Sequence, residues 1–208
     1  MLHEDAAQGS GKEEDCVKKP AAKVLLIWCA CILSLSLRIV PLPFGENFSA
    51  LGALALLCGA LIRNPVRAIA VVLACRAVTD LWLEAKTGYG FYHSMAFDYA
   101  AYAIIGAVGR LLGSRYRLAA VAGGFLAGAI FFIVSNFGVW FLSPDHRYSS
   151  DVSGLLECFR LAVPFARGTF QGDILFALAF FSAASLAFRV DRVSIGDEAS
   201  AGASAENC

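Results

Sequence analysis

Charged side chains are scarce in this sequence. Only 16% of its 208 residues are charged and 58% are hydrophobic, and the mean hydropathy is +0.65. A soluble domain carries about 25% charged and about 45–50% apolar residues, so this composition excludes a soluble globular protein. The 17 basic and 17 acidic residues leave no net charge, which argues against nucleic-acid binding. The composition predicts an integral membrane protein.

Motifs for metal binding, cofactor binding and catalysis are also missing. The seven cysteines include no Cys-x-x-Cys pair, and His3, His93 and His146 are scattered, so the ligand spacing of a structural zinc site is absent. There is no His-Glu-x-x-His sequence and no glycine-rich phosphate loop. We therefore expect no metal, no cofactor and no catalytic residue.

Six long apolar runs follow one another along the chain. A helix needs about 20 residues to cross a bilayer. The runs predict an all-α integral membrane bundle of six transmembrane helices in residues 21–190, between disordered cytoplasmic tails at 1–20 and 191–208. The second run is short unless residues 41–47 enter the membrane as irregular backbone, which needs protein or water around it. The runs are 21–37, 48–62, 66–83, 95–112, 119–142 and 170–188.

The distribution of Lys and Arg predicts the orientation of these six spans. Eleven of the basic residues fall on the side that carries both termini, and five fall on the opposite side. Because cytoplasmic loops carry the excess of Lys and Arg, both termini are expected in the cytoplasm.

Polar side chains within the spans lie at one predicted depth, near the outer ends. Arg76 and Asp80 stand four residues apart, the spacing of a same-face ion pair on a helix. The other groups either pair locally, as structural residues, or converge on a cavity open to the outside. We expect Arg76, Asp98 and Glu157 to be structural. The predicted solute-binding residues are Arg38, Asn47, Asp80, Asn136, Trp140 and Asp173.

The outer loop 143–169 is long for a compact bundle. Apolar residues at helical spacing in 154–163 predict a short interfacial helix between the fifth and sixth spans. Pro164 is expected to end this helix. It is either a lid over the cavity or an anchor on the membrane surface.

Small residues recur at every fourth position in the last two runs. This spacing lets helix backbones approach closely in lipid. It fits packing within the bundle or docking on a partner membrane protein. The two stripes on the fifth run are Ala119, Gly123 and Ala127 beside Ala120, Gly124 and Gly128, and the stripe on the sixth is Ala179, Ala183 and Ala187.

Several short motifs lie between Arg38 and Phe181: Arg38-Ile39-Val40-Pro41-Leu42-Pro43, Asn47-Phe48-Ser49, Ala53-Leu54-Ala55-Leu56, Thr79-Asp80, Phe131-Phe132, Asn136-Phe137-Gly138-Val139-Trp140, Tyr148, Gly154-Leu155, Cys158, Ala162, Pro164-Phe165 and Gly172-Asp173. Together they resemble an uncharacterised family of bacterial six-span membrane proteins. The sequence departs from that pattern at Phe159, where tyrosine is expected, and at Arg167-Gly168, where an amide residue is expected.

That family is similar in fold to the substrate-binding S-components of energy-coupling-factor transporters. The resemblance implies a protein of the bacterial inner membrane that captures a small solute from the outer side. It also implies a coupling membrane protein and two cytoplasmic ATPases as partners, besides the solute and the lipid bilayer. Fold alone does not fix function.

An intramembrane enzyme is the alternative. It would act on a small or lipid-like substrate through the outer-side carboxylates of Asp80, Asp98 or Asp173. A general base or nucleophile is needed for turnover, whereas a binding carboxylate is needed for affinity.

Overall fold

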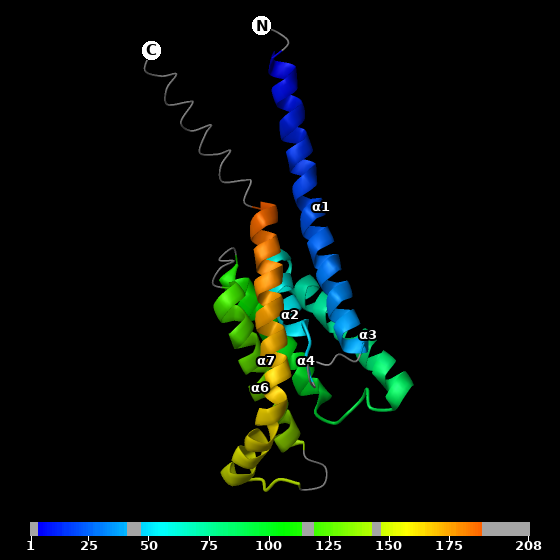
Figure 1. Ribbon diagram of the computed structural model, residues 1–208, viewed down its shortest axis with the longest axis vertical. Helices are drawn as coiled ribbons and strands as arrows, with labels where there is room; N and C mark the ends of the chain where they lie inside the picture. The colour runs from blue at the N-terminus through cyan, green and yellow to red at the C-terminus, as the bar shows by residue number, and fades with distance from the viewer. Residues whose placement is uncertain (1–3, 41–46, 114–118, 143–146, 189–208) are drawn as a thin grey trace, which may run out of the picture.

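The computed structural model describes residues 4–40, 47–113, 119–142 and 147–188. Within these ranges every regular element is helical, which confirms the all-α prediction, and each predicted apolar run contains a helix. The elements, drawn in Figure 1, are α1 (Glu4–Ile39), α2 (Leu51–Leu61), α3 (Pro65–Thr87), α4 (Met95–Leu112), a π-helical turn η1 (Ala119–Gly123), α6 (Gly124–Phe141) and α7 (Val152–Phe188).

Four helical segments are long and apolar enough to cross a membrane: Ala21–Ile39, Met95–Leu112, Ala120–Phe141 and Val152–Ala187. The 11 residues of α2 extend only about 16 Å at the 1.5 Å rise of an α-helix. The 23 residues of α3 include five charged side chains. Length and composition therefore support four spans, and crossing by α2 and α3 stays a prediction.

The predicted tails are described only in part. The first helix begins at Glu4, within the segment expected to be disordered, and its apolar part begins at Ala21. Residues 191–208 lie outside the described residues. The N-terminal part of α1 and the C-terminal end of α7 lie at the same end of the bundle (Figure 1).

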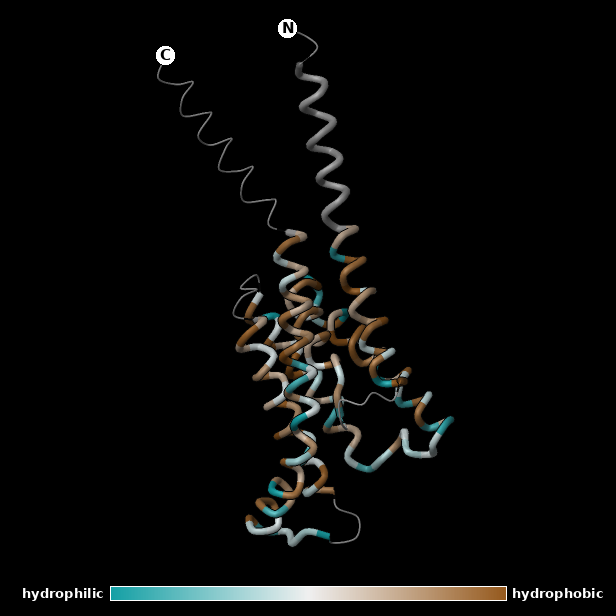
Figure 2. The backbone as a smooth tube through the Cα atoms, in the orientation of Figure 1, coloured by the Kyte–Doolittle hydropathy of each residue, from teal (hydrophilic) through white to brown (hydrophobic). Residues whose placement is uncertain are grey.

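The outer surface of the bundle is apolar. Large hydrophobic side chains such as Trp28, Leu111 and Val121 are exposed over more than half of their surface. Hydrophobic residues extend along most of the helical segments (Figure 2). Arg76, Asp80, Asp98 and Asp173, in contrast, are buried inside. This reversal of the soluble pattern is expected when lipid, and not water, surrounds the protein.

The short helix α2 forms the centre of the bundle. Its residues from Leu51 to Gly59 are all buried, and α2 contacts α1, α3, α4, α6 and α7. The backbones of α2 and α4 are in direct contact. A Cβ on Gly59 would overlap the carbonyl oxygen of Gly106, and a Cβ on Gly109 would overlap the carbonyl oxygen of Leu56. Glycine at these positions permits the close approach.

The predicted small-residue stripes have different surroundings. On α6, a Cβ at Gly124 would lie 2.8 Å from the Cα of Ile174, and one at Gly128 would lie 2.9 Å from the Phe170 ring. This stripe therefore packs α6 against α7 within the bundle. The alanines 179, 183 and 187 lie on the exposed face of α7.

The helix α7 begins at a local cap. The amide of Gly154 donates to Asp151 Oδ1 at 2.9 Å, and the hydroxyl groups of Ser149 and Ser153 donate to the same oxygen at 2.6 and 2.8 Å. These hydrogen bonds, the one from Ser149 foremost, hold the pKa of the Asp151 carboxyl at about 2. The carboxylate is therefore charged at neutral pH, as a helix N-terminus favours.

The prediction that Pro164 ends a separate interfacial helix is wrong, because α7 continues through this proline to Phe188. The segment before Pro164 is fixed to α6 by side-chain contacts. The Phe132 and Phe159 rings meet edge to face at 5.5 Å, and Cys158 Sγ donates to the Asn136 carbonyl at 3.5 Å. Packing against neighbouring helices lets a helix tolerate the loss of the one backbone hydrogen bond that proline cannot make.

Candidate functional site

The carboxylate of Asp80 joins three helices inside the bundle. Its Oδ1 accepts from Arg38 Nη2 at 3.0 Å. Its Oδ2 accepts from Arg76 Nε at 2.7 Å and from the Tyr99 hydroxyl at 3.0 Å. The Arg76 contact is the one that the spacing of four residues predicted. Since Asp80 is only 1% exposed, these hydrogen bonds replace the water that the buried charge has lost.

A second carboxylate, that of Asp98, continues this network. Arg76 Nη2 donates to the Tyr92 hydroxyl at 2.7 Å and lies 3.4 Å from Asp98 Oδ2. The Tyr92 hydroxyl in turn donates to the same Asp98 oxygen. Burial raises the pKa of Tyr92, so the phenol is neutral and keeps the proton that it donates. The Arg76 guanidinium carbon also lies 6.0 Å from the ring centroid of Tyr99.

We call this set the charge cluster. It brings together the last turn of α1, the middle of α3 and the first turn of α4. Two arginines face two aspartates, so the cluster is balanced in charge. It consists of Arg38, Arg76, Asp80 and Asp98 with the hydroxyl groups of Tyr92 and Tyr99.

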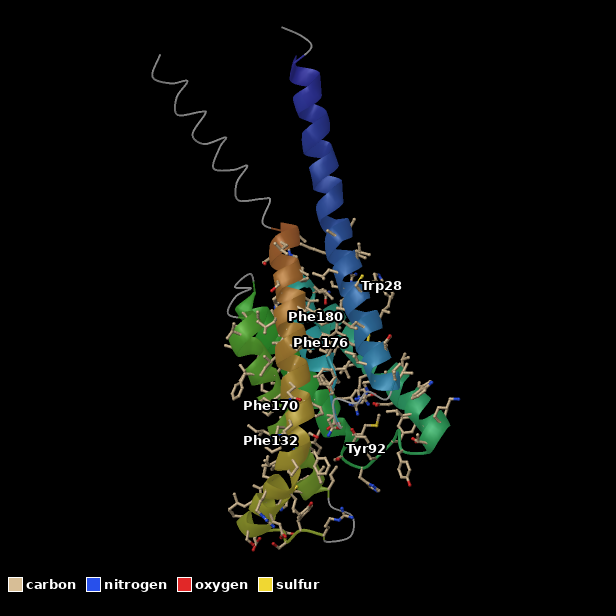
Figure 3. The ribbon with its side chains drawn as sticks, in the orientation of Figure 1. Trp28, Tyr92, Phe132, Phe170, Phe176 and Phe180 are labelled. Carbon is tan, nitrogen blue, oxygen red and sulfur yellow. The ribbon has the colours of Figure 1, made fainter. Side chains whose placement is uncertain are left out.

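A cavity of about 320 Å³ adjoins the charge cluster. It lies between α4, α6, the N-terminal half of α7 and the segment that precedes α4, and Tyr92 and Asp98 belong to both the cluster and the cavity wall. Figure 3 shows Tyr92 and Phe132, from its wall, at one level of the bundle. The lining residues are Asn47, Tyr92, Ser94, Asp98, Phe131, Phe132, Ser135, Asn136, Val139, Ala162, Phe165, Ala166 and Thr169.

Two residues that line the cavity carry side-chain oxygen atoms with hydrogen-bonding capacity. Asp98 Oδ1 is buried and has no hydrogen-bond partner among the described residues, because the contacts of this side chain use Oδ2. Asn136 donates through its amide nitrogen to the Phe132 carbonyl at 2.7 Å. Its side-chain oxygen is a hydrogen-bond acceptor by its chemistry. A wall with such acceptors and three phenylalanine rings suits a ligand that donates hydrogen bonds and carries an apolar body.

Asn47 and Asn136 are the two predicted solute-binding residues that line this cavity. Asp98, predicted to be structural, lines it as well. Sequence reasoning missed the hydroxyl groups and rings that the fold adds to the wall, because single serines and phenylalanines in apolar runs carry no positional signal. The missed residues are Tyr92, Ser94, Phe131, Phe132, Ser135, Val139, Ala162, Phe165, Ala166 and Thr169.

Asp173 lies at the N-terminus of α2, away from the described cavity lining. It is 2% exposed, and its Oδ1 accepts from the amide of Ala53 at 3.1 Å. A Cβ on Gly52 would overlap this carboxylate, so glycine gives it room. The first amides of a helix have no partner within the helix, and a carboxylate is favoured there. Asp173 therefore connects α7 to the central helix.

The remaining predicted residues lie outside the described lining. Arg38 and Asp80 are bound to each other within the charge cluster. Trp140 donates from Nε1 to the Ser149 carbonyl at 2.9 Å, which holds the chain before α7 against α6. Arg76 bridges Asp80 and Asp98, and Glu157 is exposed on α7.

Comparison with known proteins assigns the chain to one family. Residues 18–195 match a family described as a family of unknown function, DUF6580, and the chain belongs to it. This agrees with the resemblance to an uncharacterised family. No curated protein and no solved structure matches the chain.

Proposed function

We propose that this member of a family of unknown function binds a small solute for uptake, in the cavity between α4, α6 and α7. The observation that carries the proposal is a buried carboxylate, Asp98, which lines a cavity of about 320 Å³ with one oxygen unpartnered. Small-molecule sites are concave, largely apolar and supplied with a few polar groups, with volumes of about 300–1,000 Å³. The cavity has each of these properties.

The contacts of the carboxylates favour binding over catalysis. Asp80 is occupied by two arginines and a tyrosine, and Asp173 is occupied by the N-terminus of α2. Among the outer-side carboxylates that an intramembrane enzyme would use, Asp98 alone lines the described cavity. One carboxylate beside amide and hydroxyl groups is suited to orienting a solute.

The proposal places the cavity on the outer side of a bacterial cytoplasmic membrane, with both termini in the cytoplasm. The basic residues support this orientation, with eleven on the side of the termini and five opposite. The cavity involves the beginning of α4, the later part of α6 and the N-terminal half of α7, which lie toward the end of the bundle away from the C-terminal end of α7 (Figure 1).

Cysteine labelling in intact cells tests this orientation. Tyr89 and Val66 lie near opposite ends of α3 and are 84% and 73% exposed. We expect a membrane-impermeant maleimide to label Tyr89→Cys in intact cells and Val66→Cys only after permeabilisation, each relative to the parent protein. The reverse pattern would invert the orientation.

Uptake needs an energy source, and the sequence has no nucleotide-binding motif. The resemblance to S-components implies a coupling membrane protein and two ATPases as partners, and the proposal includes them. Purification from native membranes in a mild detergent is expected to retain them. A chain that purifies alone under conditions that preserve other transporter complexes would remove this part of the proposal.

Filling the cavity tests solute binding directly. Ala166 lines the cavity from α7, and Ala183 lies on the exposed face of the same helix. We expect Ala166→Leu to reduce the co-purified solute at least tenfold, about 1.4 kcal/mol, because the larger side chain occupies the site. Ala183→Leu makes the same chemical change and should retain the solute.

Native mass spectrometry of both variants and the wild type measures this occupancy. A thermal-shift screen of vitamins, amino acids and divalent ions complements it. Equal occupancy of the wild type and Ala166→Leu would contradict the proposal. So would a wild-type protein that carries no solute and is stabilised by none of these compounds.

A further inference from the structure

The two oxygens of Asp98 have different surroundings. Oδ2 accepts from the Tyr92 hydroxyl and lies 3.4 Å from Arg76 Nη2. Oδ1 is buried without a hydrogen-bond partner among the described residues, although Asp98 as a whole is only 4% exposed. Leaving such an acceptor unpaired is costly. A donor supplied by a ligand removes this cost.

The charge of the wall indicates which donor fits. Asp98 is the single charged residue among the thirteen that line the cavity in the described part of the chain. Arg76, the arginine that contacts Asp98, already donates to Asp80 at 2.7 Å and to Tyr92 at 2.7 Å. An anionic solute would therefore meet a carboxylate and find no free basic partner in this wall.

The apolar part of the wall is aromatic. Phe131 and Phe132 come from α6 and Phe165 from α7, so rings from two helices contribute to one cavity. Aromatic faces attract a cation at close range and also pack against a flat or apolar body. The side-chain oxygen of Asn136 adds a neutral acceptor, and its amide nitrogen keeps a second N–H besides the one that it donates to the Phe132 carbonyl.

We infer that the solute is a small organic cation, whose charged nitrogen donates to Asp98 Oδ1 and whose apolar body packs among the phenylalanine rings. This inference rests on the proposed function and adds the class of the substrate. It combines the unpartnered oxygen, the single charge of the wall and the rings beside it.

Three probes of matched size test the class of the solute. 2-Phenylethylamine is a cation at neutral pH, 2-phenylethanol is neutral and phenylacetate is an anion. We expect the purified full-length protein to bind the amine at least tenfold more tightly than the alcohol, and phenylacetate most weakly. Isothermal titration calorimetry in detergent measures the three affinities, and thermal unfolding provides a second readout.

Variants assign the preference to Asp98. Asp98→Asn keeps the shape of the side chain and removes its charge, so the affinity for the amine should fall to that for the alcohol. Glu157→Gln removes a charge from the exposed surface of α7 and should leave the preference unchanged. If Asp98→Asn is not recovered folded, the comparison of the three probes on the wild type decides alone.

The failures of the inference and of the proposed function differ. Phenylacetate or the alcohol binding as well as the amine, in a manner that Ala166→Leu abolishes, would overturn the cation and keep the solute-binding cavity. A co-purified solute that is neutral or anionic would do the same. The cation would also be overturned if the protein bound none of the three probes while Ala166→Leu still displaced its co-purified solute. Occupancy that Ala166→Leu leaves unchanged would overturn both.

Discussion

Replacing Asp80 with alanine is expected to remove most of the folded protein from the membrane. The carboxylate receives hydrogen bonds from Arg38 on α1, Arg76 on α3 and Tyr99 on α4. Breaking a buried ion pair costs about 3–5 kcal/mol, because the surviving charge is left uncompensated. Here two arginines lose a partner together. A loss of this size is a large part of the 5–15 kcal/mol or so that stabilises a typical protein.

A double-mutant cycle separates the pair from the general effects of truncation. Arg76→Ala should also destabilise the protein, and the double variant Arg76→Ala/Asp80→Ala should lose less than the sum of the two. Contacting charges typically show coupling energies of about 0.5–3 kcal/mol. Thermal unfolding of each purified variant in detergent measures this, with Glu157→Ala as the exposed acidic control. Strict additivity would show that the two side chains do not interact.

Local geometry explains what the sequence predicted well. The Arg76–Asp80 contact follows from a spacing of four residues, which a helix turns into neighbours on one face whatever the rest of the chain does. The helices themselves follow from apolar runs interrupted by turn residues. The cap of α3 was not predicted, although it is equally local: the Asn64 side chain accepts from the amide of Arg67 at 3.1 Å, and Pro65 follows as the first helical residue.

Tertiary contacts decide what the sequence could not predict. Asp173 and Ala53 are 120 residues apart in the chain, so no spacing rule relates the carboxylate to the helix that it caps. Pro164 was expected to end a helix, but α7 continues through it, and Cys158 and Phe159 pack the preceding segment against α6. For Asp98, depth and charge indicated a polar role. Its unpartnered oxygen depends on where Tyr92 places its hydroxyl group.

The backbone contact between α2 and α4 carries the second large prediction. Gly106 and Gly109 are both buried in α4, less than one turn apart. A Cβ on Gly106 meets nothing closer than the Ala55 carbonyl at 3.8 Å, which is ordinary contact. A Cβ on Gly109 would overlap the carbonyl oxygen of Leu56 and would lie 2.7 Å from its Cα. Gly106 is therefore a matched control within the same helix.

We expect Gly109→Ala to lower stability by about 1–3 kcal/mol or more, since backbone atoms cannot rotate away from an added methyl group as a side chain can. Alanine favours the helix over glycine by roughly 1 kcal/mol at both positions, so Gly106→Ala should be neutral or stabilising. Thermal unfolding of the two variants in detergent gives the comparison, and equal shifts would contradict the contact between α2 and α4. Asp98 lies in the first turn of α4. Moving α4 away from α2 is therefore expected to displace this carboxylate from the cavity as well. Gly109→Ala should therefore lose solute together with stability, whereas Gly106→Ala keeps both.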